Sequence, residues 1–368
     1  MASEESRGSG QFHDFQTVKS LVLDCSKEEG GQVRDRMIDI GLRDIVACEK
    51  AADLPALLKE HSPDLLLLDI DGEREEVCAA IQALRCQNQD AGNPFAVVVG
   101  ITASTSRDAV TAALEAGVDS LVARPIDSTG LRACLREQVE DRKDFIATDE
   151  YVGPDRRPAG RDPSDDELVS VEVPNALKSK ANGDDVDPAD AQKRVEETLR
   201  SLAVQRVWHL TRKTSELAEN ARRAMEAGND FPLLGECVEA MDNSLSRITD
   251  LESDFGLVGV AEVIASSRAA LETINMAGED LTARHFELLR VHADSVELAM
   301  KQDDDARDSL VTELERAVAA VRASDLAGTG KKNGKKAGGD GYSFKVRFLA
   351  WWEGIDPSDV MAARQEST

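Results

Sequence analysis

Positive charge is scarce in this chain of 368 residues. It has 44 Lys and Arg against 70 Asp and Glu, which gives a formal net charge of -26 at pH 7. Binding to DNA, RNA or an anionic membrane needs clustered Lys and Arg that neutralise phosphate groups, and no basic recognition helix is evident. The composition therefore excludes nucleic acid as an expected partner and favours proteins.

Long apolar runs are also absent. No uninterrupted apolar stretch reaches about 18 residues, so no stable membrane insertion is expected. The first six residues are polar and acidic, without the apolar core of a signal peptide. The six cysteines form no Cys-x-x-Cys pair, which favours buried thiols over metal ligands or disulfides. We therefore expect a soluble protein of the reducing cytoplasm.

Hydrophobic content is nonetheless sufficient for a real core, because 41% of the residues are hydrophobic. After a polar tail over residues 1–16, short apolar runs alternate with helical patterns as far as residue 141. The five runs lie at residues 21–24, 45–48, 65–69, 95–101 and 120–123. Since parallel strands need crossover helices, the pattern predicts an α/β domain over residues 17–141 with a doubly wound, five-stranded parallel sheet.

The most informative run is DLLLLD at residues 64–69. Four successive leucines without alternation predict a strand that is covered on both faces. Asp69 closes this run, and Asp24, Thr102 and Arg124 close or follow other runs. Ligands of open α/β sheets bind at the carboxyl ends of the strands. These four side chains are therefore the candidate functional site.

Three motifs, in this order, resemble the receiver domain of response regulators. They are the leucine-rich strand ending in Asp69, Ile101-Thr102-Ala103 at the end of the fourth run, and LEAGVDSLVARPID at residues 114–127. The last is similar to the receiver pattern of a helix, Ala-Gly-Ala/Val-Asp, a strand and Lys-Pro. The resemblance covers about residues 17–141 and implies a flavodoxin-like sheet of strand order 2-1-3-4-5.

The resemblance also implies a chemistry. In the family, an aspartate accepts a phosphoryl group, acidic side chains hold Mg²⁺, and a hydroxyl and a lysine contact the phosphoryl oxygens. The matching phosphoacceptor is Asp69, and Thr102 and Arg124 match the hydroxyl and the lysine. The expected Mg²⁺ ligands are Asp24, Asp69 and Asp71, because the Asp71 carboxylate can replace an acid that is missing at position 25.

Three positions depart from the family pattern. Cys25 stands where the principal acidic metal ligand is expected, and a thiol is a poor ligand for Mg²⁺. Arg124 stands in place of the family's lysine, so a planar guanidinium replaces a compact ammonium. Leu121 stands in place of the aromatic residue that reports activation. Two hypotheses stand: phosphorylation at Asp69, or a pseudo-receiver that binds partners without it. In a plainer alternative, Asp24 and Asp69 form a salt bridge with Arg124, and this salt bridge only neutralises charge in the polar depression at the carboxyl ends of the strands.

The pattern breaks down over residues 142–190, where Gly, Pro, Asp and Arg predict a flexible linker. From residue 191 to 324 a 3.6-residue period returns, with breaks near residues 228–230, 256 and 278–280. It predicts five amphipathic helices packed as an antiparallel bundle. Because such helices commonly dimerise or accept a partner helix, we expect a protein-interaction domain and consider a homodimer.

Two histidines of the predicted bundle are candidates for a phosphoryl carrier. Neither His209 nor His292 is followed by the Lys-Gly pair typical of histidine phosphotransfer modules, so ordinary helix-surface histidines are the better interpretation. A degenerate module stays an alternative. The sequence of this half shows no nucleophile with a base, no Gly-rich phosphate loop and no clustered metal ligands. We therefore expect a protein that is not an enzyme.

A Lys/Gly spacer over residues 325–341 precedes an aromatic C-terminal segment at residues 342–368. Its aromatic residues are spaced near one and two helical turns, and they are Phe344, Phe348, Trp351 and Trp352. Buried aromatic residues dominate the energy of interfaces. The segment therefore predicts either docking on an outside partner or folding back on the chain.

Together these features predict a cytoplasmic two-component signal transduction protein. Its receiver-like domain controls or docks the helical interaction domain. The expected partners are a sensor kinase or phosphotransfer protein and a downstream signalling protein. The alternatives are a pseudo-receiver scaffold and a phosphorelay protein with a degenerate histidine phosphotransfer bundle.

Overall fold

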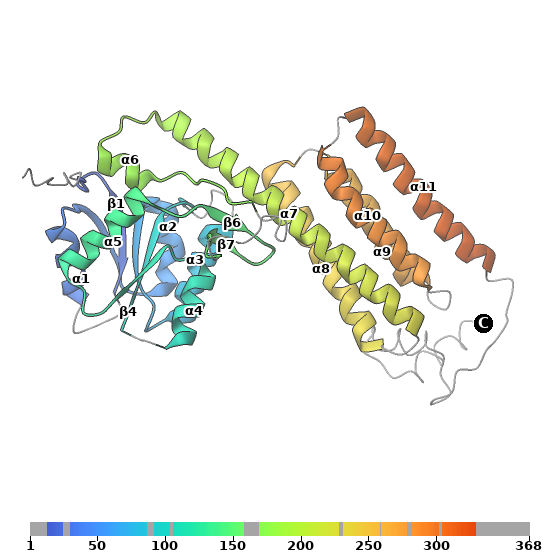
Figure 1. Cartoon of the computed structure of the whole chain (residues 1–368), viewed down its shortest axis with the longest axis horizontal. Helices are drawn as coiled ribbons and strands as arrows, with labels where there is room; N and C mark the ends of the chain where they lie inside the picture. Colours follow the sequence, from blue (N-terminus) through green and yellow to red (C-terminus); the bar gives the residue numbers. More distant parts are fainter. Residues whose placement is uncertain are drawn as a thin grey trace, which may run out of the picture. The chain divides into compact units, whose positions relative to one another are not determined.

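The chain divides into two units within one long helix. The first unit ends at Leu202 and the second begins at Ala203, and both residues lie in α7 (Pro188–Ala227). We call them the receiver-like unit and the helical unit (Figure 1). The computed structural model describes residues 13–24, 30–86, 92–103, 106–157, 169–227, 231–257, 259–277, 282–301 and 304–328.

Several sequence predictions fall outside the described residues. They concern most of the polar tail, Cys25, the Lys/Gly spacer from residue 329 onward, and the aromatic segment at residues 342–368. Among the described helices, none is both long and apolar enough to span a bilayer. None of the five cysteines that the structure describes forms a disulfide.

A five-stranded parallel sheet forms the centre of the receiver-like unit (Figure 1). Its strands are β1 (Lys19–Leu23), β2 (Asp44–Cys48), β3 (Leu65–Asp69), β4 (Val97–Thr102) and β5 (Ser120–Ala123). Their order is β2-β1-β3-β4-β5, and every neighbouring pair is parallel. The predicted doubly wound fold and the strand order 2-1-3-4-5 are confirmed.

Helices cover both faces of this sheet. On one face lie α2 (Leu54–His61), which follows the short helix η1 (Ala51–Asp53), α3 (Arg74–Cys86) and α4 (Arg107–Ala116). On the other face lie α1 (Gly30–Asp39) and α5 (Ser128–Glu140). Because helices close both faces, the four leucines of β3 are at most 1% exposed. The leucine run is the doubly covered strand that the sequence predicts.

The described residues of the 142–190 segment, 142–157 and 169–190, do not form the flexible linker that the composition predicts. The described part contains an antiparallel hairpin, β6 (Phe145–Ala147) and β7 (Val152–Pro154), then α6 (Ala176–Asn182) and the start of α7. All six residues of the hairpin strands are buried. The composition rule fails here because the segment does not need a core of its own, since it packs against the α/β core.

The segment that we call the cap, residues 142–157, is fixed by aromatic and cationic contacts. The Phe145 side chain is fully buried, and its ring lies edge-on to that of Phe95 with 6.0 Å between the centroids. The guanidinium groups of Arg85 and Arg142 lie 5.0 and 5.1 Å from the Phe145 centroid. Such cation–π contacts are strongest where both partners are desolvated. The cap is therefore an integral part of the receiver-like unit.

Helix α6 is attached to the same unit by an ion pair and by apolar packing. The Lys180 ammonium donates to the Asp64 carboxylate at 2.6 Å, and the backbone N–H of Lys19 donates to the same oxygen at 2.8 Å. Leu177 and Ala181 are buried in the core between the sheet and helices α1 and α5. The unit therefore continues well beyond the predicted boundary at residue 141.

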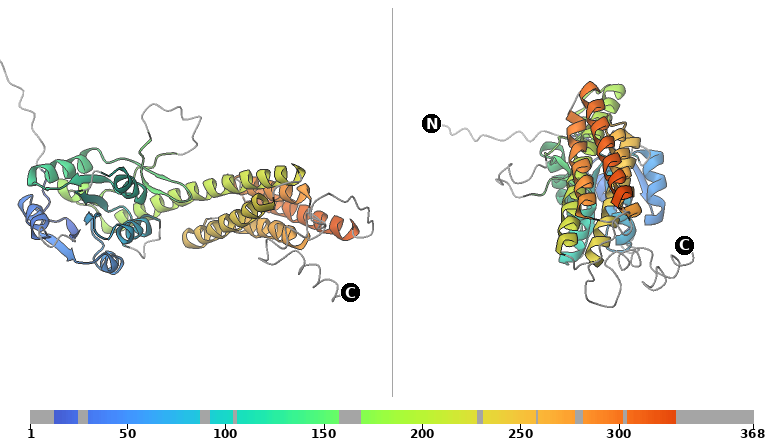
Figure 2. Two further views of the ribbon diagram at one scale, coloured as in Figure 1. Left: turned by 90° about the horizontal axis from the view of Figure 1, so that it is seen from below. Right: turned by 90° about the vertical axis from the view of Figure 1, so that its right-hand side faces the viewer.

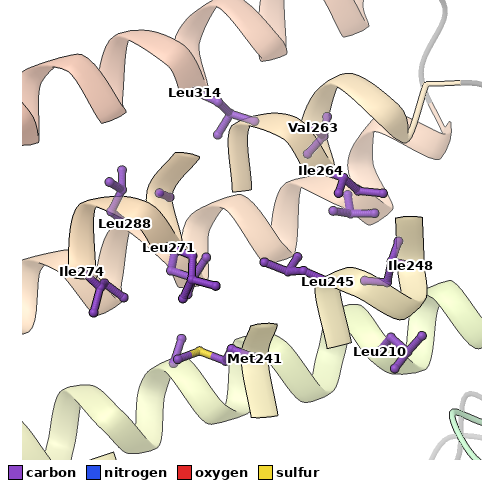
Figure 3. Close-up of a cluster of buried hydrophobic side chains, with 14 of the residues drawn as sticks. Leu210, Met241, Leu245, Ile248, Val263, Ile264, Leu271, Ile274, Leu288 and Leu314 are labelled. Atoms are coloured by element: carbon purple, nitrogen blue, oxygen red, sulfur yellow. The ribbon is translucent and has the colours of Figure 1, made fainter. Parts of the chain in front are cut away.

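The helical unit is built from α7 and four further helices. These are α8 (Phe231–Phe255), α9 (Ala261–Ala277), α10 (Ala283–Lys301) and α11 (Asp304–Gly328). Helix α9 packs against α8, α10 and α11, and these helices lie side by side in Figure 2. All five contribute to one hydrophobic core, for example through Leu210, Met241, Leu271, Leu288 and Leu314 (Figure 3). The five predicted helices are present.

His292 is a core residue, so its interpretation as a helix-surface histidine is wrong. It is 0% exposed, and its Nδ1 lies 2.7 Å from the Leu288 carbonyl oxygen while Nε2 lies 3.1 Å from Ser266 Oγ. A carbonyl only accepts, so in the neutral ring Nδ1 carries the proton and Nε2 accepts from the hydroxyl. A side chain enclosed in this way is not accessible as a phosphoryl carrier. His209 is half-buried, with its ring against Trp208.

We expect Phe145→Ala to lower the free energy of unfolding of the receiver-like unit by about 3 kcal/mol, because a fully buried ring and its contacts are lost. Urea unfolding measures the change. Val169→Ala is the matched control, since Val169 is 66% exposed and lies in the same segment after α5. If Phe145→Ala lowers the free energy of unfolding no more than Val169→Ala does, residues 142–157 are not an integral part of the folded unit.

The stability of the helical unit should fall as the pH drops below about 6.5. Burial lowers the pKa of His292, an effect that contacts with the carbonyls of Leu288 and Leu314 only partly offset. When the pH is above the ordinary pKa of histidine, His292 is unprotonated in both the folded and the unfolded chain. Below it the unfolded chain takes up the proton first, so unfolding becomes easier until the pH passes the folded pKa.

Urea unfolding followed by circular dichroism, at about pH 7.5 and pH 5.5, measures this dependence. His292→Gln should remove part of the pH dependence, whereas the half-buried control His209→Gln should keep it. Identical pH dependence in the two variants contradicts the assignment to His292.

Candidate functional site

The candidate site is assembled from the carboxyl ends of four strands. Asp24 follows β1, Asp69 closes β3, Thr102 closes β4 and Arg124 follows β5. Because these strands are parallel neighbours, their carboxyl ends lie at one edge of the sheet. The structure therefore brings the predicted strand-end residues to the same edge.

Arg124 joins the two aspartates. Its Nη2 donates to Asp24 Oδ1 at 2.9 Å and to Asp69 Oδ2 at 3.0 Å. The side chains of Arg124, Asp24 and Asp69 are only 11%, 6% and 5% exposed, so solvent screens these ion pairs weakly. The plainer sequence hypothesis, a salt bridge from Arg124 to both carboxylates, describes the arrangement that is formed.

Asp71 and Thr102 bind each other. Thr102 Oγ1 donates to Asp71 Oδ1 at 2.6 Å, and the backbone N–H of Ala103 donates to Asp71 Oδ2 at 2.5 Å. The N–H of Asp71 in turn donates to Asp69 Oδ1 at 3.0 Å. The carboxylate of Asp71 is thus bound to the end of β4, while those of Asp24 and Asp69 are bound to Arg124.

The described side chains do not fit a Mg²⁺ site in this arrangement. The expected ligands were Asp24, Asp69 and Asp71, but no group of three or more Asp, Glu, His or Cys side chains within the described residues is placed to hold a metal ion. Mg²⁺ demands near-octahedral oxygen ligands. Here the Arg124 guanidinium supplies the positive charge that faces Asp24 and Asp69.

Leu121, at the position of the expected aromatic residue, packs inward. It is partly buried against the core on the face covered by α2, α3 and α4. A Cβ atom on Gly100 would lie 2.7 Å from Leu121 Cδ2, so the glycine gives this side chain its space in the neighbouring strand. Leu121 therefore belongs to the packing between β4 and β5.

A second charged cluster was missed by the sequence reasoning. Asp119, just before β5, accepts from Arg85 Nη2 at 2.7 Å through Oδ2 and from Arg142 Nε at 2.8 Å through Oδ1. The three side chains are at most 4% exposed. Burial alone would raise the pKa of Asp119, but the Arg142 and Arg85 guanidinium groups outweigh it and hold that pKa below its ordinary value.

A sequence signal for this cluster existed in α3. Val77, Ile81 and Leu84 define the apolar stripe of that helix, and Arg85 follows the last of them directly. Arg85 is 2% exposed. A charged residue beside an apolar stripe indicates a buried partner, because an unpaired buried charge is very costly. The identity of that partner depends on tertiary structure.

Comparison with known proteins gives a limited match. No family model matches the chain. Over 114 residues it is 33% identical to the transcriptional regulatory protein CitT of Bacillus subtilis (strain 168), which covers 30% of this chain and 48% of that protein. The chain thus spans about half the length of this curated relative.

A solved structure, the signal receiver domain of a two-component histidine kinase from Clostridium thermocellum, is 20% identical. The match covers 34% of this chain and 99% of that chain, with a TM-score of 0.30. The strand order of the sheet and the strand-end aspartates, which carry the resemblance, are observed directly. The N-terminal unit thus has the five-stranded sheet topology of a receiver domain.

We expect Arg124→Met to lower the free energy of unfolding of the receiver-like unit by about 3 kcal/mol, because it leaves two nearly buried carboxylates without their cation. Urea unfolding measures the loss. The triple variant with Asp24→Asn and Asp69→Asn should regain most of the stability, since no buried charge then lacks a partner. Equal stability of Arg124→Met and the parent chain would contradict a structural ion pair.

Proposed function

We propose that this chain is a two-component signalling protein whose receiver-like unit binds partner proteins in a state that Arg124 holds, without Mg²⁺-dependent phosphorylation of Asp69. The observation that supports the proposal is the pairing of one guanidinium with both strand-end carboxylates, at 2.9 and 3.0 Å. The helical unit acts as a second protein-interaction domain. The protein is not an enzyme.

The charge balance of the site supports this function. Two carboxylates and one permanently charged guanidinium leave a single net negative charge at Asp24, Asp69 and Arg124. A lysine ammonium is a compact point charge, whereas the guanidinium fork presents several fixed donors. Arg124 therefore stabilises the pair of aspartates without any other cation. The net charge of these three side chains then stays the same, because no phosphoryl group is added.

The hydrogen bonds of Asp71 support the same conclusion. Its two carboxylate oxygens accept from Thr102 Oγ1 and from the N–H of Ala103. Charge-assisted hydrogen bonds of 2.5–2.6 Å are strong. The hydroxyl that would contact a phosphoryl group is thus directed to a neighbouring carboxylate, and Asp71 does not replace the acid missing at position 25.

A second candidate function is phosphorylation of Asp69. The position of the Asp69 carboxylate beside Arg124, with Thr102 at the end of the next strand, favours it. In this reaction an Asp69 oxygen attacks the phosphorus of a phosphohistidine. The O–P bond forms as the N–P bond breaks, and the imidazole nitrogen keeps the electron pair. The donor would be a sensor kinase or a phosphotransfer protein.

The partners are inferred from chemistry. A net charge of -26 favours proteins over nucleic acid. The curated relative is named a transcriptional regulatory protein, but the match covers 48% of its length. We therefore propose that the partner is a downstream signalling protein. We also propose that this chain acts in the cytoplasm.

The test is incubation of the full chain with MgCl₂ and acetyl phosphate, followed by intact-mass measurement before and after acid treatment. Our proposal predicts no acid-labile adduct. The variant Cys25→Asp with Arg124→Lys, which restores the family residues, should gain one, and adding Asp69→Asn should abolish it. An acid-labile adduct on Asp69 of the unaltered chain would support the second candidate function instead.

A binding experiment completes the test. The parent chain and Asp69→Ala serve as baits for partner proteins from the native cell extract. Recovery of the same partners in the same amounts is the expected result. Loss of a partner from Asp69→Ala alone, with an unfolding free energy that still permits folding, would show that binding depends on Asp69.

A further inference from the structure

The turn between α4 and β5 is bound by three arginines from two segments, α3 and the cap. Gly117, Val118 and Asp119 form this turn. Arg85 of α3 donates through Nε to the Gly117 carbonyl at 3.1 Å and through Nη2 to the Asp119 carboxylate at 2.7 Å. Arg142 and Arg156 belong to the cap, residues 142–157. Backbone carbonyls in a turn are normally satisfied by water or backbone, so two arginine donors on the carbonyls of this turn are unusual.

The cap supplies two of these contacts. Arg142 Nε donates to Asp119 Oδ1 at 2.8 Å, and Arg156 Nη2 donates to the Val118 carbonyl oxygen. The close fit is visible at Gly153, where an added Cβ would lie 3.0 Å from Gly117 Cα and 2.7 Å from the Tyr151 hydroxyl. The cap therefore touches the turn through backbone as well as through charged side chains.

The other end of β5 is bound by the strand-end ion pairs. β5 spans only Ser120–Ala123, and Arg124 follows it directly. Arg124 binds Asp24 and Asp69, whereas Asp119 at the opposite end binds Arg85 and Arg142. Both ends of a four-residue strand are thus held by nearly buried ion pairs.

β5 also depends on these end contacts more than the inner strands do. It lies at the edge of the five-stranded sheet and pairs with β4 alone. Three of its four residues are half-buried and Ala123 is exposed, while all six residues of β4 are buried. An edge strand with one ladder and little burial is held less firmly by packing, so contacts at its ends contribute a larger share of its stability.

We propose that the cap is a conformational lock on β5, which holds the turn just before the first residue of the strand and thereby keeps Arg124, at its far end, in register with Asp24 and Asp69. The lock explains why a receiver-like unit carries a buried extension after its fifth helix. It applies whether or not Asp69 accepts a phosphoryl group, because its contacts lie at the opposite end of the strand.

Hydrogen exchange measured by NMR on the full chain tests the lock. The N–H of Asp119 donates to the Val98 carbonyl and the N–H of Arg124 donates to the Thr102 carbonyl, so these two amides report the two ends of β5. In Arg156→Ala, exchange at both amides and along Ser120–Ala123 should accelerate about tenfold, the effect of losing one charged hydrogen bond.

Arg157→Ala is the matched control. Arg157 is the next residue, but it binds Asp155 and Ser170. The control should leave β5 exchange unchanged. Acceleration at Asp119 alone, with Arg124 unaffected, would overturn the proposal because the cap would then fasten only the turn.

Gly153→Ala provides a second, steric route to the same result. Its added Cβ would separate the cap from Gly117 without removing any charge. The expected result is again faster exchange along β5, with β1 and β3 protected as in the parent chain. Unchanged β5 exchange in both Arg156→Ala and Gly153→Ala would overturn the proposal, and retained protection in β1 and β3 shows that the variants are folded.

Discussion

The carboxylate of Asp119, shared between the guanidinium groups of Arg85 and Arg142, is the interaction on which the receiver-like unit depends. Its three side chains are at most 4% exposed and come from the turn before β5, from α3 and from the cap. The N–H of Val98 in β4 also donates to the same carboxylate. A charge buried this deeply is tolerated only when all its partners are in place. Sheet, helix and cap must therefore adopt their arrangement together.

The sequence predicts the parts of the fold that depend on hydrophobic period, and it misses the parts that depend on long polar side chains. The leucines of β3 and the strand-end position of Asp69 follow from local pattern. The cap does not, because its short apolar strand at Phe145–Ala147 is stabilised by Arg85, which lies 60 positions earlier in the chain. No local rule relates two such segments. His292 was misassigned for the same reason, since its partner Ser266 lies on another helix.

The departures at the strand-end site are physically consistent with one another. In the sequence, Cys25 stands where the family pattern has its second acid, so the motif has one carboxylate fewer for a cation to balance. A guanidinium, which binds Asp24 and Asp69 together from one nitrogen, is then sufficient. The loss of an acid and the presence of arginine in place of lysine thus both reduce the need for a metal ion to balance the carboxylates. Under the proposed function, both changes favour an internal ion pair over an external metal ion, and this is the reason to consider the substitutions as a set.

In the helical unit the buried bond between His292 and Ser266 joins two helices, while other buried hydroxyl groups bond within their own helix. In the helical unit, Thr211, Thr214 and Ser267 donate to carbonyls four residues earlier in their own helices, so these bonds do not specify how helices pack. In the receiver-like unit the buried polar bonds connect separate elements. Polar networks between elements can specify a unique arrangement, whereas apolar cores accept repacking more readily. In the receiver-like unit such bonds, for example from Arg85 to Asp119, therefore help to fix the positions of separate elements.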